Sequence, residues 1–395
     1  MNPPVRRGRV RRAVLQLADL ALAGLAAVAV SACAAAGPTA AQTGPSDGLQ
    51  AAPQGTGAAD DGAHVVAQHR IDARTLDLTI YSPAMAANEP VRLLLPPDWN
   101  TRPDARWPVL YLLHGCCGSY VGWTRSTDVV QLTAGTDVLV VMPDAGADGF
   151  YSNWWNGGSA GPPRWETFHL TELRQILERG FRASPRMAVA GLSMGGFGAM
   201  KYAETGLFRA AASYSGVLDP LSKTGGVLAF LYRKAIWGDP VAQRAIWMAN
   251  DPKYHVHLLH RVKLFVASGN GQPGPYDRSS QTTDPIEAEV YAESLNFVHA
   301  LRHAHVPVTT DFYGPGTHSW PYWQRDLHQS FPMLMQAIGA KPASAGQAAA
   351  AESPTATTVG LPGVQVSACD LGDKFQSACN RWAACAPLGS VSVRD

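Results

Sequence analysis

The chain has 395 residues, with 32 Lys and Arg against 31 Asp and Glu and a formal net charge of +1. A balance this close to zero gives no long-range field that would attract a polyanion, so we expect no nucleic-acid partner. Hydrophobic residues make up 46% of the chain, and the length allows one large domain between low-complexity ends.

The N-terminus is typical of a secretory signal. Five arginines lie among the first twelve residues, and an Ala/Leu/Val-rich stretch follows up to about Val30. We therefore expect residues 1–36 to be an export signal, and the protein to be secreted or held at the cell envelope. Two processing routes stay open. Either Cys33, at the end of a lipobox-like Val30-Ser31-Ala32-Cys33, is lipidated and attaches the chain to a membrane, or the signal is simply cleaved among residues 34–41.

Low-complexity segments bound the globular part. Residues 37–62 and 341–360 are rich in Gly, Ala, Pro, Ser and Thr and cannot bury enough apolar surface to fold, so both are expected to be linkers. The domain between them covers residues 63–340. A tail of unknown fold, residues 361–395, carries three cysteines, which leaves one thiol beyond a single disulfide.

Seven apolar runs of strand length divide the domain. They cover residues 91–95, 109–113, 138–142, 187–190, 210–214, 262–268 and 306–313. From the second run onward they are continuously apolar, as expected for strands covered on both faces. Amphipathic patterns predict helices over residues 165–181, 194–204, 286–303 and 322–338, and the partial alternation of residues 65–82 predicts antiparallel edge strands. Together, these strands and helices predict an α/β fold with a mostly parallel central sheet and helices on both faces.

A candidate nucleophile follows the fourth apolar run. The pentapeptide Gly191-Leu192-Ser193-Met194-Gly195 has the G-x-S-x-G pattern of a nucleophile elbow. In this turn a serine is held in a strained backbone conformation between a strand and a helix, and small neighbours leave room for the turn and for a carbonyl substrate. Ser193 is therefore the expected nucleophile.

A serine hydroxyl needs an imidazole to accept its proton and a carboxylate to orient that imidazole. His318 lies in a Gly/Pro-rich loop directly after the last apolar run, where it can reach the carboxyl edge of the sheet. For the acid, the segment after residues 262–268 offers Asp284, Glu287 and Glu289, and spacing alone leaves all three open.

The oxyanion of an ester reaction needs preorganised N–H donors. We assign them to the backbone of Met194, at the start of the helix after the nucleophile, and of Cys116, in the loop after residues 109–113. Two interpretations of the side chains of Cys116 and Cys117 stay open: they form a vicinal disulfide, or they are two buried thiols.

Aromatic residues and histidines add further candidates. We expect substrate contacts from His114, Trp123, Tyr151, Trp154 and Trp320. An H-x-H pair on a strand would project both rings to one face as metal ligands, but His255, His257 and His260 have no accompanying Cys or carboxylate pattern. We therefore expect neither a metal site nor a cofactor.

Five motifs together resemble the antigen 85 mycolyltransferases and their esterase D relatives. They are FYSNW at residues 150–154, WETF at 165–168, GLSMG at 191–195, GNG at 269–271 and GTHSWPYW at 316–323. The resemblance covers residues 91–334 and implies an α/β-hydrolase fold with a Ser-Glu-His triad at Ser193, Glu287 and His318. Glu287 is the choice because it precedes Phe297 by ten residues, as the family's glutamate precedes its aromatic position.

The resemblance also implies acyl transfer through an acyl-serine. Where the mycolyltransferases present an acidic and a basic residue to trehalose, this chain has His114 and Cys117, which favours water as the acceptor. The expected function is thus an exported serine esterase acting on acyl esters. The alternatives are an acyltransferase that moves a fatty or mycolic acyl group to a sugar or glycerol, and a non-catalytic surface binding protein.

Overall fold

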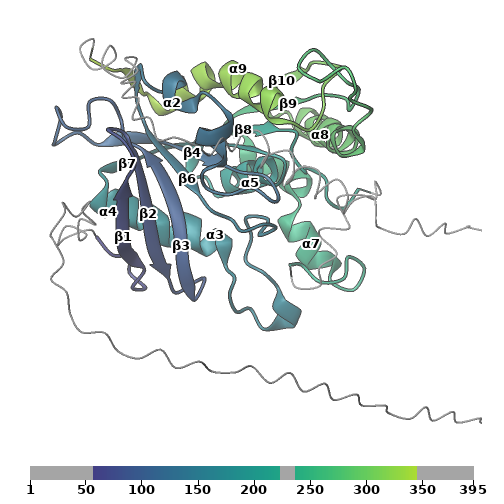
Figure 1. Ribbon diagram of the computed structural model, residues 1–395. Coiled ribbons are helices and arrows are strands. Elements are labelled where there is room, and N and C mark those ends of the chain that lie inside the picture. Colours follow the sequence, from purple (N-terminus) through teal and green to yellow (C-terminus); the bar gives the residue numbers. More distant parts are fainter. Residues whose placement is uncertain (1–56, 223–235, 345–395) are drawn as a thin grey trace, which may run out of the picture. The chain divides into compact units, whose positions relative to one another are not determined.

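The computed structural model describes residues 57–222 and 236–344, which form a layered α/β structure (Figure 1). Its main sheet has nine strands in the order β1-β2-β3-β6-β4-β7-β8-β9-β10. The strands are β1 (His64–Arg70), β2 (Thr75–Ser82), β3 (Ala87–Leu94), β4 (Trp107–Leu113), β6 (Leu139–Pro143), β7 (Ala183–Leu192), β8 (Phe208–Tyr214), β9 (Lys263–Ser268) and β10 (Thr309–Phe312). All seven apolar runs are strands, which confirms this part of the prediction.

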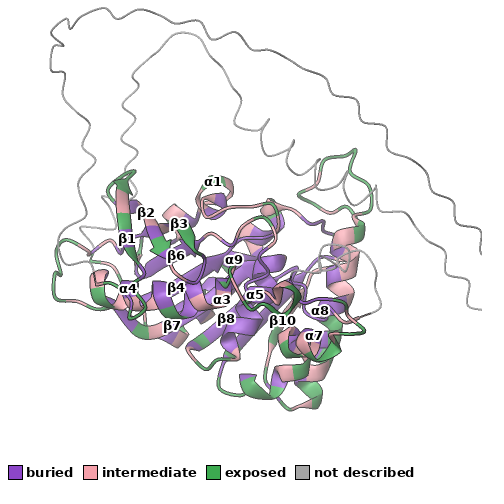
Figure 2. Cartoon of the chain, turned by 90° about the horizontal axis from the view of Figure 1, so that it is seen from below, coloured by how far each residue is buried: buried purple, intermediate pink, exposed green. Residues whose placement is uncertain are grey.

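Strand direction divides the sheet into two parts. Strands β1, β2, β3 and β6 pair antiparallel in sequence, and the strands from β6 to β10 pair parallel. All seven residues of β4 are buried, and Figure 2 shows the same for most of the central sheet. Burial on both faces explains why these strands are continuously apolar rather than alternating.

Helices cover both faces, as expected. They are α1 (Gly122–Ser126), α2 (Val129–Leu132), α3 (Trp165–Thr167), α4 (Arg174–Gly180), α5 (Met194–Ala203), α7 (Arg244–Asn250), α8 (Pro285–His303) and α9 (Trp320–Ile338). The buried side chains of α4, α5 and α8 form one core with one face of the sheet, and those of α9 form a second core with the other face. Figure 1 shows α9 and α4 on opposite sides of the strands.

The predicted helix over residues 165–181 contains an irregular turn. Between α3 and α4, residues Phe168–Leu173 form a π-helical turn, η2. This turn carries the buried His169, whose ring nitrogens lie 2.8 Å from Tyr202 Oη and 2.8 Å from the Asp144 carbonyl oxygen. Burial lowers the pKa of His169 to about 3, so the ring is a neutral structural group.

The structure extends the domain at both ends. Residues 57–62 were expected to belong to a linker, but Ala59 is buried and Arg179 forms an ion pair of 2.6 Å with Asp60. Lys341–Pro342, expected to begin the second linker, form strand β11 against β5 (Thr136–Asp137). The expected signal, Cys33 and the cysteine-containing tail lie outside the described residues.

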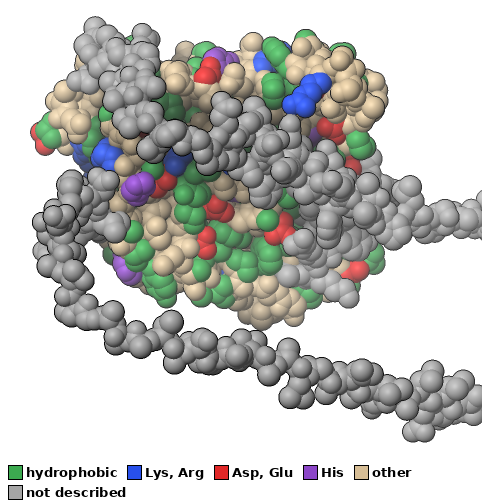
Figure 3. Space-filling model, in the orientation of Figure 1, with side chains coloured by type: hydrophobic (Ala, Val, Ile, Leu, Met, Phe, Trp, Pro, Cys, Tyr) green, Lys and Arg blue, Asp and Glu red, His purple; other side chains and the backbone are tan. Residues whose placement is uncertain are grey.

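Surface features add two observations. Across the described ranges, every helix is too short or too polar to span a bilayer. On the face seen in Figure 3, acidic and basic side chains are interspersed with apolar ones, in keeping with the balanced charge of the chain.

Candidate active site

Ser193 occupies a strained turn between β7 and α5. Its φ of 53° and ψ of −121° are unfavourable for a residue with a side chain. A Cβ on Gly191 would collide with the backbone of Gly195, and one on Gly195 with the carbonyl oxygens of Leu113 and His114. Both flanking glycines are therefore required by close backbone packing.

Glu287 and His318 meet at the carboxyl ends of neighbouring parallel strands. His318 Nδ1 lies 2.7 Å from Glu287 Oε2, and both side chains are buried. Because an ionised carboxylate can only accept hydrogen bonds, Nδ1 carries the proton and Nε2 has the free lone pair of a base.

Three further donors surround the other oxygen of this carboxylate. Glu287 Oε1 lies 2.9 Å from Ser215 Oγ, 2.9 Å from Ser268 Oγ and 2.8 Å from the backbone nitrogen of Gly269. Hydrogen bonds to a carboxylate offset the cost of its burial, so these donors hold the Glu287 side chain in one orientation.

The two other acid candidates have different positions. Asp284 is the N-cap of α8, where Oδ1 accepts from the backbone N–H groups of Ile286 and Glu287. Its Oδ2 accepts the backbone N–H of His318 at 3.0 Å. Glu289 is half-buried and lies roughly 200° around the helix from Glu287, so the two side chains leave opposite sides.

A second aspartate, Asp277, fixes the loop before His318. Its carboxylate lies 2.5 Å from Thr317 Oγ1 and 2.8 Å from Tyr322 Oη. Asp277 is not predictable from the sequence, because only the folded loop brings it to residues forty or more positions further along the chain. Its place in a Gly/Pro-rich segment between two strands was the one available signal.

Ser193 and His318 belong to the same edge of the sheet but are not hydrogen-bonded to each other in the described structure. Ser193 follows β7 and His318 follows β10, at the carboxyl ends of parallel strands. A continuous path of contacts links them: the backbone N–H of Ser193 donates to Tyr214 O at 2.9 Å, and the next residue, Ser215, binds Glu287.

The loop after β4 approaches Ser193 closely. A Cβ on Gly115 would lie 3.1 Å from Ser193 Cβ, which places this loop directly beside the elbow. Gly118 N–H donates to Gly115 O at 3.1 Å, so Cys116 and Cys117 are the central residues of a tight turn, and Cys117 has a φ of 58°. Met194 begins α5, where the first N–H groups of a helix have no intrahelical acceptor.

His114, expected to contact substrate, is buried, and its ring supports this loop. Its Nδ1 lies 2.8 Å from Gly115 O, and Nε2 accepts the backbone N–H of Ala145 at 3.0 Å. Burial lowers the pKa of His114, so both ring nitrogens of the neutral form are engaged in positioning backbone.

The structure agrees fully with neither interpretation of Cys116 and Cys117, the vicinal disulfide or the two buried thiols. Cys116 and Cys117 are thiols rather than a vicinal disulfide. Cys116 is half-buried, but Cys117 is exposed, so the expectation of two buried thiols is wrong for the second.

Burial also separates the aromatic candidates. Trp123 is 1% exposed and Tyr151 is fully buried, with its hydroxyl donating to His114 O at 2.8 Å, so both belong to the core and not to a cleft wall. Trp154 and Trp320 are half-buried. Trp320 packs edge-on against Trp323, which in turn packs edge-on against the His318 ring.

The three clustered histidines lie in a 3-10 helix, η3 (Pro252–Leu259), or just after it, and not on a strand. His255 Nδ1 lies 3.2 Å from Glu204 Oε2, while His257 and His260 are exposed. Among residues 57–222 and 236–344, no three His, Cys, Asp or Glu side chains are grouped as metal ligands would be.

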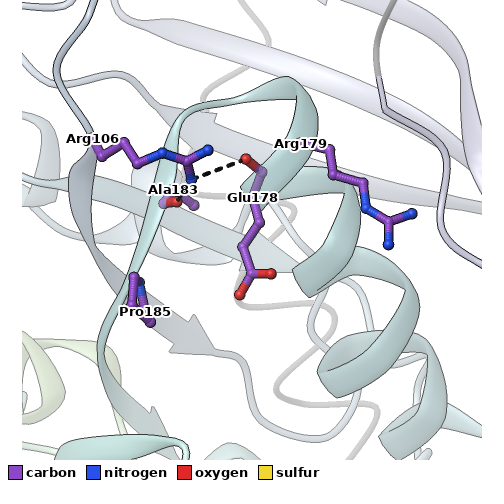
Figure 4. A pocket seen from close by; sticks show the side chains of 5 residues that line it. All are labelled: Arg106, Glu178, Arg179, Ala183 and Pro185. Carbon is purple, nitrogen blue, oxygen red and sulfur yellow. Dashed lines mark hydrogen bonds between the residues drawn. The ribbon is translucent and has the colours of Figure 1, made fainter.

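Two cavities are lined by residues other than Ser193, Glu287 and His318. One of about 370 Å³ opens beside Ala183 and Pro185, at the start of β7 and hence at the edge of the sheet opposite Ser193 (Figure 4). Its Arg106 already donates to the carbonyl oxygens of Glu178 and Ala183. The second, of about 280 Å³, is next to the His318 loop and is lined by Pro275, Tyr276, Tyr313, Pro315, Tyr322 and Arg325.

Comparison with known proteins agrees with this architecture. Residues 82–334 match the family model described as Putative esterase. Esterase Rv1288 of Mycobacterium tuberculosis is 32% identical over 263 residues, which cover 62% of this chain and 56% of that protein. The chain thus spans little more than half the length of that relative.

Acyltransferases are also among the relatives. The diacylglycerol acyltransferase/mycolyltransferase Ag85B of Mycobacterium avium is 33% identical over 261 residues, covering 60% of this chain and 78% of that protein. These relatives confirm the resemblance to the antigen 85 proteins.

Solved structures share the fold. The crystal structure of Mycobacterium tuberculosis MPT51 matches with a TM-score of 0.56 at 28% identity, over 68% of this chain and all of that one. An S-formylglutathione hydrolase from Agrobacterium tumefaciens matches with a TM-score of 0.54 at 16% identity, over 70% of this chain and all of that one, and supports the fold alone. The chain therefore belongs to the esterase family defined by the matching model, and its fold is that of the α/β hydrolases.

Proposed function

We propose that the chain is a serine esterase that cleaves acyl esters through an acyl-serine intermediate. Ser193 is the nucleophile, His318 the base and Glu287 the acid that orients it. The observation that carries this proposal is the buried Glu287 carboxylate, which accepts His318 Nδ1 at 2.7 Å at the same sheet edge as the strained Ser193. Family membership and the esterase and acyltransferase relatives support the same class of reaction.

The chemistry follows from the assigned proton positions. His318 Nε2 accepts the proton of Ser193 Oγ while Oγ attacks the ester carbonyl carbon. The backbone N–H groups of Met194 and Cys116 stabilise the resulting oxyanion. The imidazolium then gives its proton to the leaving alcohol, and an acyl-serine remains. A water molecule activated by the same nitrogen releases the acid.

This mechanism requires Ser193 Oγ and His318 Nε2 to be within hydrogen-bond range in the substrate complex. Contacts between nucleophile and base are often long in substrate-free enzymes and shorten in the complex. The contact with Glu287 orients the His318 ring for this step.

The test is covalent labelling with a fluorophosphonate probe together with turnover of a chromogenic ester. We expect the wild type to gain one probe adduct at Ser193 and to hydrolyse the ester. Ser193→Ala should do neither, and Ser184→Ala, at the opposite end of β7, serves as a serine control outside the proposed site. Turnover by Ser193→Ala at the wild-type rate would refute the assignment of the nucleophile.

Acyl transfer is a second candidate because Ag85 proteins named as acyltransferases are among the relatives. Mass spectrometry after incubation with an activated ester plus trehalose or glycerol separates the two. Acyl-trehalose or acylglycerol would favour transfer, whereas free acid alone favours hydrolysis. If the wild type neither binds the probe nor turns over ester, a non-catalytic binding role is favoured instead. Export, with or without a lipid on Cys33, is part of the proposal and is supported by the signal-like N-terminus.

A further inference from the structure

Ser215 has an unusual backbone for a buried serine. It follows β8 directly, is fully buried and has a φ of 47°, in the left-handed region where side chains cost energy. Its N–H donates to Ala267 O on β9 at 2.8 Å. The surrounding sheet therefore holds this residue in place despite the strain.

The hydroxyl of Ser215 has only one possible direction. Trp323 Nε1 lies 3.1 Å from Ser215 Oγ, and an indole N–H can only donate, so the serine oxygen is the acceptor there. The hydroxyl proton is then left for Glu287 Oε1, 2.9 Å away, which as a carboxylate can only accept. Trp323 thus fixes the polarity of a chain that runs from the indole through the serine to the acid.

Ser215 also links both sides of the proposed site. The preceding residue, Tyr214, accepts the backbone N–H of Ser193 at 2.9 Å. Trp323 packs edge-on against the His318 ring, with centroids 4.9 Å apart and planes at 85°. Ser215 and the residue before it therefore contact the backbone of Ser193, the carboxylate of Glu287 and the tryptophan that packs against His318.

We propose that Ser215 is a positioning residue whose hydroxyl, aligned by Trp323, orients the Glu287 carboxylate toward His318 and sets the basicity of that imidazole. This inference rests on the proposed function and names a residue that acts through Glu287 without touching substrate. Other charged groups near the carboxylate are Asp284, which holds the backbone of His318, and the buried Asp326 on α9.

The expected effect has a defined sign. Removing a donor from a carboxylate raises its basicity, and a more basic carboxylate stabilises the imidazolium more strongly. The acidic limb of the kcat/KM profile should therefore move to higher pH. Loss of orientation should lower kcat about tenfold or more, the factor that corresponds to one hydrogen bond to a charged group.

Two variants separate the hydroxyl from the backbone. Ser215→Ala removes the hydroxyl and keeps the strained φ, whereas Ser215→Gly removes the hydroxyl and relieves the strain. We expect both to lose kcat and to shift the acidic limb, with KM little changed. Full recovery of kcat in Ser215→Gly would show that only the backbone matters and would overturn the proposal, as would a wild-type kcat and pH profile in both variants.

A matched control and an independent readout complete the design. Ser330→Ala removes another buried serine hydroxyl, which lies 2.5 Å from Tyr214 Oη, and should lower stability without moving the pH limb. If Ser215→Ala does not fold, Trp323→Phe tests the same chain by freeing the hydroxyl to rotate, and an unshifted pH limb there opposes the proposal. NMR titration of the His318 ring, assigned with His318→Gln, measures its pKa without turnover, so this inference and the proposed esterase activity can fail separately.

Discussion

Asp284 holds His318 and the helix that carries Glu287 with the two oxygens of one carboxylate. Oδ2 accepts the backbone N–H of His318 at 3.0 Å, and Oδ1 caps α8 by accepting from Ile286 and Glu287 at 3.0 and 3.2 Å. Glu287 and His318 are thereby both bound to Asp284, outside their own contact. Their relative position depends on this residue as well as on the hydrogen bond between them.

Substitution of Asp284 should separate the two functions of its carboxylate. Asp284→Ala loses the helix cap and the hydrogen bond to the His318 N–H. We expect a loss of about 1 kcal/mol in the free energy of unfolding and a fall in kcat. Asp284→Asn can keep the cap through its carbonyl oxygen but turns an amide N–H₂ toward the His318 N–H. We expect near-wild-type stability by urea unfolding with a kcat as low as that of the alanine variant. Wild-type kcat in Asp284→Asn would mean that the hydrogen bond between Asp284 and the His318 N–H has no part in catalysis.

The identity of the acid can be tested with a matched pair of amides. Glu287→Gln places an N–H₂ group among four donors and removes the partner of His318 Nδ1, so kcat should fall by about 10³-fold or more. Glu289→Gln, on the opposite side of α8, should retain activity within about twofold. The measurement is steady-state hydrolysis of a chromogenic ester. The reverse ranking would transfer the role of acid to Glu289.

Glu204 should make stability depend on pH. Burial raises its pKa from 4.5 to about 8, opposed by the nearby Lys201, and its Oε2 faces His255 Nδ1. Because the folded state keeps this proton more tightly than the unfolded state does, its stabilising contribution is complete below about pH 4.5 and is lost as the pH rises toward 8.

Glu204→Gln should remove that part of the pH dependence. Glutamine mimics the protonated form, so unfolding free energies at pH 4 should match the wild type. At pH 8.5 the variant should be more stable by about 1–2 kcal/mol, a fraction of the full linkage value because the group is only partly desolvated. If the difference in unfolding free energy between the two proteins is the same at all pH values, the burial of a protonated Glu204 is contradicted.

Gly195 should be intolerant of a methyl group. A Cβ there would collide with the backbone carbonyl oxygens of Leu113 and His114, which cannot move without disturbing β4. We expect Gly195→Ala to lower the free energy of unfolding by about 1–3 kcal/mol, despite the better helix propensity of alanine. Gly135→Ala, which would meet nothing within 4 Å, is the control. Equal melting temperatures for the two variants would contradict the packing described for the elbow.

The local pattern of the sequence predicted most of the regular structure. The apolar runs in the middle of the sheet are strands covered on both faces, whereas β10, at the edge of the sheet, is partly exposed. The long amphipathic patterns are α4, α5, α8 and α9 or parts of them. The short helices α1, α2 and α7 escaped prediction because four to seven residues show too little periodicity. The π turn at Phe168–Leu173 escaped it for another reason, since it depends on buried contacts of His169 with distant residues.

The sequence by itself determined the parallel α/β architecture, the strained serine between glycines and the loop that carries His318, since these follow from hydrophobic period and from turn chemistry within a few neighbouring residues. Only the tertiary structure shows that Glu287, rather than Asp284 or Glu289, contacts the His318 ring, and that the side chains of His114, Trp123 and Tyr151 are buried. The physical reason is that the role of a carboxylate or a ring depends on its burial and its hydrogen-bond partners. Those of Glu287 come from residues 215, 268 and 318, which approach one another only when three separate strands take their places in the sheet.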